Sequence, residues 1–303
     1  ATAAPRPVPA GSLRAWAVAV RPRSLPVALS PVLVGAALGW ARTGAVDPVA
    51  ALLVLGAALL MQVVTNLQND VGFTVRGGER GGTRTGLPRA TAQGWLSVRG
   101  VRAAIAVAAL AATGLGLALV AYRGWPVLVI GTASLLAALA YMGGPKPIAY
   151  TPFGALTVFV FFGLVAVMGT DWALTGSVGA ATVPASAAIG CLAAAALAVN
   201  NHRDTAHDRR VGRHTFAVSL GAARSRRLFS ALVLTPFALL PVIGLLARAP
   251  AMVLPLLLLP RAWALRRDFV RCASGAAFNA VVFRSFGLEL AFAVLLSLAA
   301  VVA

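Results

Sequence analysis

The chain has 303 residues, of which 59% are hydrophobic and only 11% are charged, and its mean hydropathy is +0.86. A soluble globular domain carries about 25% charged residues, so this composition excludes a soluble enzyme, a disordered chain and a nucleic-acid-binding protein. The formal net charge of +18 instead indicates a membrane protein whose basic loops face anionic lipid.

Stretches of about 20 apolar residues predict membrane-spanning helices, and the chain contains nine candidates. Most are free of charge, but the eighth is short and rich in Leu and Pro, and the ninth is interrupted by Arg284 and Glu289. The sequence therefore predicts an all-α polytopic membrane protein with nine transmembrane helices in a single domain over residues 1–303. Residues 1–20 form an N-terminal cytoplasmic segment in this interpretation, without a cleavable signal peptide. The nine candidates cover residues 24–41, 48–69, 103–122, 124–145, 147–170, 172–201, 228–247, 249–260 and 283–302.

Basic residues are distributed unevenly between the two ends of these helices. If the N-terminus is cytoplasmic, 23 of the 26 Lys and Arg side chains fall in inside segments. Only Arg42, Arg123 and Arg248 then fall outside. The positive-inside rule therefore predicts a protein integral to the cell membrane, with its N-terminus in the cytoplasm and its C-terminus outside.

Two of the inside regions carry acids directly after a long apolar helix. Asn66 and Asp70 are four residues apart in the first region, and Asn200, Asp204 and Asp208 repeat this spacing in the second. On a continuing helix such side chains share one face, so we expect the two acidic helix ends to face each other across a central cavity. Oxygen ligands in this arrangement suit Mg²⁺, which is held by a few carboxylates together with phosphate and water. The simpler alternative is that these acids only neutralise neighbouring arginines at the lipid surface.

Arginines surround both acid regions. A guanidinium fork matches phosphate oxygens, and Mg²⁺ bridges carboxylate to phosphate, so the combination predicts a diphosphate site. The alternative is that the arginines only set the topology and contact lipid headgroups. The arginines concerned are Arg76, Arg80, Arg84 and Arg89 after the first region, and Arg203, Arg209, Arg210 and Arg213 around the second.

With these motifs the sequence resembles the UbiA superfamily of intramembrane aromatic prenyltransferases, and in particular its 1,4-dihydroxy-2-naphthoate polyprenyltransferase branch. The similarity is most specific over residues 200–208, which read Asn-Asn-His-Arg-Asp-Thr-Ala-His-Asp. Residues 21–26, 86–94 and 141–150 also resemble segments of this branch. The chain departs from the family in the first acid region, because Phe73 and Thr74 stand where a further aspartate is expected.

The resemblance implies a nine-helix bundle around a lipid-accessible cavity, dependence on Mg²⁺, and transfer of a polyprenyl group from a polyprenyl diphosphate to a small aromatic acid. In the naphthoate branch this reaction belongs to menaquinone biosynthesis, and the acceptor loses its carboxylate. Two alternatives stay open, namely another aromatic acceptor such as 4-hydroxybenzoate, and an ion-coupled transporter. A transporter places its ionisable groups near the bilayer midplane, whereas these acids lie at inner helix ends.

The resemblance also implies roles for individual residues. Asp70, Asp204 and Asp208 are expected to act in catalysis through Mg²⁺, and Lys146 to bind the diphosphate or the acceptor carboxylate. Tyr141 and Tyr150 either stabilise an allylic cation by cation–π attraction or are ordinary interfacial aromatics. The expected metal ligands are Asn66, Asp70, Glu79, Asn200, Asp204 and Asp208. The expected substrate-binding residues are Asn66, Arg89, Gln93, Tyr141, Tyr150, Asn200, Arg203 and Arg213.

Overall fold

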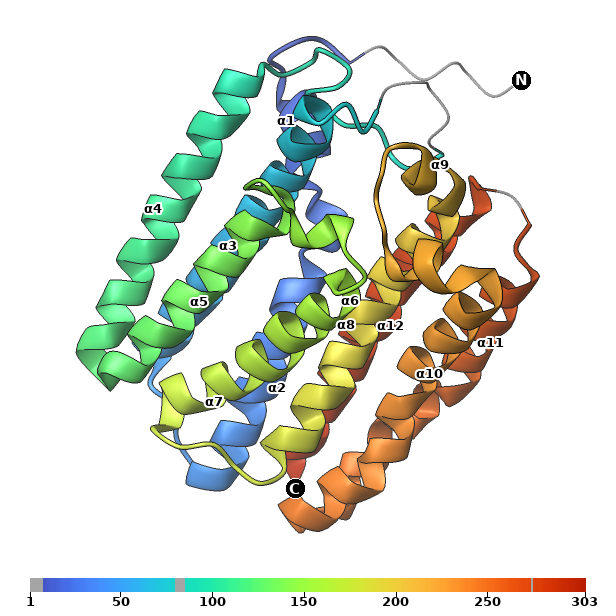
Figure 1. Cartoon of the computed structure of the whole chain (residues 1–303). Helices are drawn as coiled ribbons and strands as arrows, with labels where there is room; N and C mark the ends of the chain where they lie inside the picture. Colours follow the sequence, from blue (N-terminus) through green and yellow to red (C-terminus); the bar gives the residue numbers. More distant parts are fainter. Residues whose placement is uncertain (1–7, 80–84, 274) are drawn as a thin grey trace.

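The computed structural model describes residues 8–79, 85–273 and 275–303, and this part of the chain is helical with no β-strand (Figure 1). Sixteen helical elements follow one another along it. The first eight are α1 (Leu13–Val20), η1 (Pro22–Ser24), α2 (Pro26–Thr43), α3 (Pro48–Val75), α4 (Val98–Arg123), α5 (Trp125–Met142), η2 (Ile148–Tyr150) and α6 (Gly154–Val158). The others are η3 (Phe159–Val165), α7 (Ala166–Thr175), α8 (Thr182–Arg203), α9 (Thr205–Arg210), α10 (Phe216–Ala247), η4 (Pro250–Leu258), α11 (Leu259–Arg271) and α12 (Ala277–Val302).

The N-terminal part is a bent pair of helices. Ser12 caps α1 by accepting a hydrogen bond from the Ala15 amide, which satisfies one of the free N–H groups of the first turn. Arg21 ends α1 with a left-handed backbone (φ 56°), a conformation that non-glycine residues adopt rarely. The chain then passes through η1 into α2, and the two helical pieces meet at 41°. This bend carries α1 against α3 instead of continuing the line of α2.

The long helices begin and end where the sequence supplies caps. Asp47 caps α3 by accepting hydrogen bonds from the Val49 and Ala50 amides, and Pro48 occupies the first helical position. Ser97 caps α4 in the same way through the Gly100 amide. These caps fix where α3 and α4 enter the bundle.

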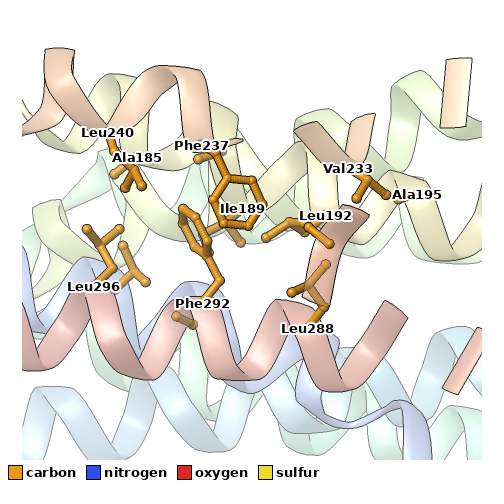
Figure 2. Packing of buried hydrophobic residues seen from close by; sticks show 14 of the residues in the cluster. Ala185, Ile189, Leu192, Ala195, Val233, Phe237, Leu240, Leu288, Phe292 and Leu296 are labelled. Carbon is orange, nitrogen blue, oxygen red and sulfur yellow. The ribbon is translucent and has the colours of Figure 1, made fainter. Parts of the chain in front are cut away.

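α8 lies in the middle of the C-terminal half because its side chains are small. Eight of its 22 residues are alanines, which let neighbouring helices approach closely, as is usual between helices in membranes. Ile189 and Leu192 of α8 meet side chains of α10 and α12, and Phe237 packs edge-to-face on Phe292 at 5.5 Å (Figure 2). This hydrophobic cluster holds α8 in place, and with it the polar residues at the C-terminal end of α8.

Seven helices of the described chain are long and apolar enough to cross a membrane, and the bent pair of α1–η1 with α2 makes an eighth. The predicted all-α membrane architecture is therefore confirmed. The nine-helix count is not, because the eighth candidate, residues 249–260, holds only the short helix η4 (Pro250–Leu258) before the arginine-rich α11 begins at Leu259. The structure also corrects the expectation of one continuing helix over residues 200–208. α8 ends at Arg203, and Asp204 joins it to the short helix α9.

Candidate functional site

Four segments from distant parts of the sequence meet at one end of the bundle. They are the C-terminal end of α3, the loop over residues 85–97, the turn around η2, and α9 with the residues that follow it. His207 of α9 lies 2.6 Å from the Gly78 carbonyl oxygen, and the His214 amide donates to the Tyr150 carbonyl at 2.9 Å. These contacts bring the two acid regions of the sequence into one site.

A cavity of about 1090 Å³ opens beside these segments. Its far part is apolar and is lined by α4, α5 and η3, for example by Leu117, Leu136 and Phe161. Its near part is basic, and among the described lining residues one acid, Asp204, stands against several arginines. The arginines are Arg14, Arg21, Arg23, Arg89, Arg203 and Arg213. An apolar cavity with a cationic end fits an amphiphile with an anionic head and a hydrocarbon tail.

The second acid region provides two buried carboxylates. Asp204 accepts two hydrogen bonds from Arg203, at 2.8 and 2.7 Å, and Arg203 also donates to Asn279 at 2.6 Å. Asp208 accepts a hydrogen bond from Arg213 at 2.6 Å through Oδ1. Backbone hydrogen bonds from residue 204 to 200 and from 208 to 204 keep the helical spacing across the break between α8 and α9.

Asp208 has one carboxylate oxygen to spare. Its side chain is fully buried, and Oδ2 has no hydrogen-bond partner in the described part of the chain. Burial raises the pKa of Asp208 above its usual range, Arg213 opposes this shift, and nearby Asp204 adds to it. A buried oxygen without a partner is costly unless a ligand completes it.

The carboxylates of the first acid region are bound by groups of the protein itself. Asp70 is buried, and its oxygens accept hydrogen bonds from the Ala90 amide, the Thr91 amide and the Thr91 hydroxyl at 2.6–2.9 Å. Glu79 pairs with Arg89 at 3.0 Å. Asp70 therefore anchors the loop that carries Arg89. The metal ligation predicted for Asn66, Asp70 and Glu79 stays a prediction, and here all three side chains bind partners within the protein.

Among the described residues, side chains of the protein alone do not form a cage for a metal ion at this site. No group of three or more His, Cys, Asp or Glu side chains within the described ranges is arranged to hold a metal ion. Asn200 and Asp204 line the cavity, whereas Asp208 does not line it and keeps its buried Oδ2 without a hydrogen-bond partner in the described part of the chain. Mg²⁺ is characteristically bound by one or two carboxylates, with substrate phosphates and water completing its coordination.

Aromatic rings contact the arginines of this site. The guanidinium carbons of Arg89 and Arg213 lie 3.9 and 4.6 Å from the ring centroid of Phe73. Tyr150 is approached by Arg76 at 5.7 Å and by Arg213 at 5.5 Å. Burial raises the pKa of the Tyr150 phenol above 10.0, so this ring stays a neutral partner for the guanidiniums.

The other predicted residues divide into two groups. Asn66, Tyr141 and Asn200 line the cavity, as do Arg89, Arg203 and Arg213. Lys146 and Gln93 are exposed residues of connecting segments and do not line the cavity. Their roles stay predictions, and the structure does not place either side chain at the cavity. Arg80 and Arg84, also predicted at the site, lie outside the described residues.

Sequence reasoning assigned no site role to the three N-terminal arginines. The sequence predicts a role in membrane topology for Arg14, Arg21 and Arg23, yet all three line the cavity, near the bend between α1 and α2. The signal was present in the sequence, since Arg21 and Arg23 belong to one of the segments that resemble the naphthoate branch. In the sequence, Phe73 is only a position that lacks the expected acid, and no local pattern indicates its contacts with two arginines.

Comparison with known proteins decides the family. The sequence profile described as the UbiA prenyltransferase family matches residues 28–288, which is most of the chain. The chain belongs to the UbiA prenyltransferase family. The resemblance inferred from the motifs is thereby confirmed, and the transporter alternative is removed.

Curated relatives and solved structures agree with this assignment. The chain is 35% identical over 227 residues to 1,4-dihydroxy-2-naphthoate octaprenyltransferase of Escherichia coli, covering 73% of each chain. It is 36% identical over 227 residues to the Mycobacterium tuberculosis protein of the same name, covering 73% of this chain and 75% of the relative. The fold matches a UbiA homologue from Archaeoglobus fulgidus bound to DMAPP and Mg²⁺, with a TM-score of 0.68, 15% identity, and coverage of 95% and 99% of the two chains.

Proposed function

We propose that this UbiA-family chain transfers a polyprenyl group from a polyprenyl diphosphate to 1,4-dihydroxy-2-naphthoate, a step of menaquinone biosynthesis. The observation that carries the proposal is the polarity of the cavity, which is basic beside Asp204 and apolar along α4, α5 and η3. This division matches a substrate with a diphosphate head and a hydrocarbon tail. The identity of about 35% to octaprenyltransferases that act on the naphthoate supports the choice of acceptor.

The diphosphate binds at the basic end in this proposal. Arg89, Arg203 and Arg213 donate to its oxygens, since all three guanidiniums line the cavity. Mg²⁺, held by Asp204 and Asp208 with Asn200 beside them, supplies positive charge to the departing diphosphate when it is bound. Arg203 and Arg213 already pair with these two aspartates, so the carboxylates and the guanidiniums are held in register for the same leaving group.

The apolar part of the cavity protects the reaction from water. The allylic carbon becomes positively charged as its bond to the diphosphate oxygen breaks, and water in contact with it forms a prenyl alcohol. The lining of α4, α5 and η3 offers mainly hydrocarbon, so it holds the tail and excludes water. Tyr141 lines the cavity and packs in one cluster with Phe73, and in this proposal its ring stabilises the developing cation. The electron-rich ring of the acceptor then attacks this carbon, and the ring loses its carboxylate as CO2 while the new carbon–carbon bond is kept.

We also propose nine membrane crossings with the site at the cytoplasmic side. In this proposal two further segments cross the membrane besides the seven long helices. They are α2, with its bent N-terminal part, and the continuous η4–α11 segment. An odd number of crossings agrees with Figure 1, in which α1 and α9 lie toward one end of the bundle and the C-terminus lies at the other. The partition of basic residues supports a cytoplasmic location for the end with α1 and α9.

The test is product formation by the full-length chain in lipid nanodiscs. Octaprenyl diphosphate and Mg²⁺ are supplied with either 1,4-dihydroxy-2-naphthoate or 4-hydroxybenzoate, and products are identified by mass spectrometry. We expect a prenylated, decarboxylated naphthoate product and one released diphosphate per turnover. A product from 4-hydroxybenzoate alone would replace the proposed acceptor. Absence of diphosphate release with both acids would overturn the reaction itself.

A further inference from the structure

Phe73 follows Asp70 by three residues in the first acid region, at the offset where the second region has His207 after Asp204. It lies on α3 less than one turn beyond Asp70, its side chain is buried, and it lines the cavity. A phenyl ring has no lone pair for a metal ion. The nearby acids do not replace one, because Asp70 binds the 90–91 backbone and Glu79 pairs with Arg89. The α3 side of the site therefore presents a ring to the cavity.

Two guanidiniums converge on this ring from different segments. Arg89 comes from the loop after α3, and Arg213 from the residues after α9, yet their guanidinium carbons lie 3.9 and 4.6 Å from the same centroid. Each is held by further contacts. Arg89 donates to Glu79 and to the Asn69 carbonyl, and Arg213 donates to Asp208 and to the Ala149 carbonyl. The ring face attracts both cations and offsets part of their mutual repulsion.

The charge of the cavity lining favours the same interpretation. Six arginines and one aspartate, Asp204, line the cavity within the described part of the chain. Guanidiniums keep their positive charge at every physiological pH and bind phosphate oxygens in pairs. On the α3 side, the positive charge of the arginines therefore takes the place of a cation that a carboxylate at position 73 would otherwise hold against the diphosphate. The carboxylate of Asp208, with its unpartnered Oδ2, remains on the α9 side.

We infer that Phe73 is a stacking platform that aligns Arg89 and Arg213 as a diphosphate receptor, and that a single divalent cation, on the Asp204 and Asp208 side, completes the site. The inference rests on the proposed function only in taking a diphosphate as the ligand. It assigns Phe73 a positioning role that acts through the two arginines. It also predicts that part of the affinity for diphosphate is independent of metal.

The first experiment measures binding of inorganic pyrophosphate to the full-length protein in nanodiscs by calorimetry, in EDTA. Wild-type protein is expected to bind pyrophosphate without metal, and Phe73→Leu to bind it about five- to tenfold more weakly, since two cation–π contacts are lost. Phe73→Tyr keeps the ring and should bind like wild type. Phe161→Leu is the matched control, because Phe161 lines only the apolar part of the same cavity. Arg89→Lys keeps the charge, removes the planar group and should resemble Phe73→Leu.

Each result bears on the inference. Thermal unfolding of every variant identifies loss of folding, and Phe73→Met, which keeps much of the side-chain volume without the ring, carries the test if Phe73→Leu does not fold. Equal affinity of wild type and Phe73→Leu would overturn the platform. So would equal losses in Phe73→Tyr and Phe73→Leu, or absence of metal-free binding in the wild type.

The second experiment counts cations with Mn²⁺, a hard ion that replaces Mg²⁺ and is detected by electron paramagnetic resonance. In saturating pyrophosphate we expect one bound Mn²⁺ per chain, and none in Asp208→Asn. Two bound ions, or none, would overturn the single-cation site. Neither experiment requires an acceptor or turnover. A chain that gave the expected binding but formed no prenylated product would therefore contradict the proposed function and leave this inference standing.

Discussion

Two carboxylates at the junction of α8 and α9 differ from every other acid of the described chain that was assigned a site role. Asp204 lines the cavity, and Asp208 keeps a buried oxygen without a hydrogen-bond partner, whereas Asp70 and Glu79 are bound within the protein. Both carboxylates are already paired with arginines that line the same cavity. These aspartates can therefore exchange their arginine partners for an arriving cation, while the arginines bind the diphosphate.

We expect Asp204→Asn and Asp208→Asn each to lower kcat by about 10²–10³-fold, the usual loss when one group that stabilises developing negative charge is removed. The neutral amide keeps the shape but removes the charge that holds the cation. Asp268→Asn is the matched control, because Asp268 is an exposed residue of α11 that pairs with Arg284 at 2.7 Å. Wild-type turnover in either site variant would contradict the metal assignment.

Asp70 and Glu79 should rank differently. Asp70→Ala leaves the buried backbone amides of Ala90 and Thr91 without their acceptor, which costs about 1–3 kcal/mol for each unsatisfied group and frees the loop that positions Arg89. Glu79→Ala removes one ion pair of Arg89. We expect Asp70→Ala to abolish activity and Glu79→Ala to reduce it partially. Measured kcat/KM values in the opposite order would show that Glu79 is the more important acid.

At the scale of elements, the contact between η3 and α8 depends on two glycines. A Cβ atom on Gly163 would lie 2.4 Å from the Gly190 Cα, so the two backbones touch directly. The close contact between the two backbones holds η3, a π-helical segment that lines the cavity, against α8. The cavity wall therefore depends on the absence of side chains at this contact.

Gly163→Ala is expected to destabilise the protein by about 1–3 kcal/mol, because overpacking forces the two helices apart. Gly169→Ala, one helix further along the same segment, provides the control, since its new Cβ would meet Ile130 at an ordinary 3.6 Å. Thermal unfolding in detergent, followed by circular dichroism, distinguishes the two. Equal melting temperatures for both variants would show that the glycine contact is not required.

Glu289 is a second feature of the helix packing. It is fully buried in α12, and neither carboxyl oxygen has a hydrogen-bond partner in the described part of the chain. Removing such a group relieves a desolvation cost of about 1–3 kcal/mol, so Glu289→Leu should melt at a higher temperature than wild type. Glu289→Gln keeps a buried polar group and should melt close to wild type. A lower melting temperature for Glu289→Leu would reveal a partner that stabilises this carboxyl.

At the scale of the whole molecule, topology decides which compartment supplies the substrates. Ala206 is exposed on α9 beside the two aspartates, and Ala45 is exposed in the turn between α2 and α3. Single cysteines at these positions, in a chain with Cys191 and Cys272 replaced, report the two sides of the membrane. A membrane-impermeant maleimide applied to intact cells should label Ala45→Cys and spare Ala206→Cys. Labelling of Ala206→Cys would place the site outside and overturn the proposed topology.

The sequence by itself determined the properties that depend on order along the chain. The length of the apolar stretches requires helices in a membrane, because every backbone polar group there must be satisfied within its own segment. The spacing of Asn200, Asp204 and Asp208 identified the acids, and backbone hydrogen bonds preserve that spacing even where α8 breaks. The family followed from the same local motifs. These features were predictable because each depends on residues within one or two helical turns.

Only the tertiary structure decided what each side chain meets. Asp70 accepts hydrogen bonds from residues 20 and 21 positions away, and Arg21 and Arg23 reach the cavity through a bend that no local pattern indicated. From the sequence alone, Phe73 only indicates that an acid is missing. In the structure, Arg89 and Arg213 both contact its ring. Contacts between distant segments are set by how the helices pack, and this packing depends on all of their side chains together. The local sequence therefore fixes which groups are available, whereas their partners are fixed only once the bundle has formed.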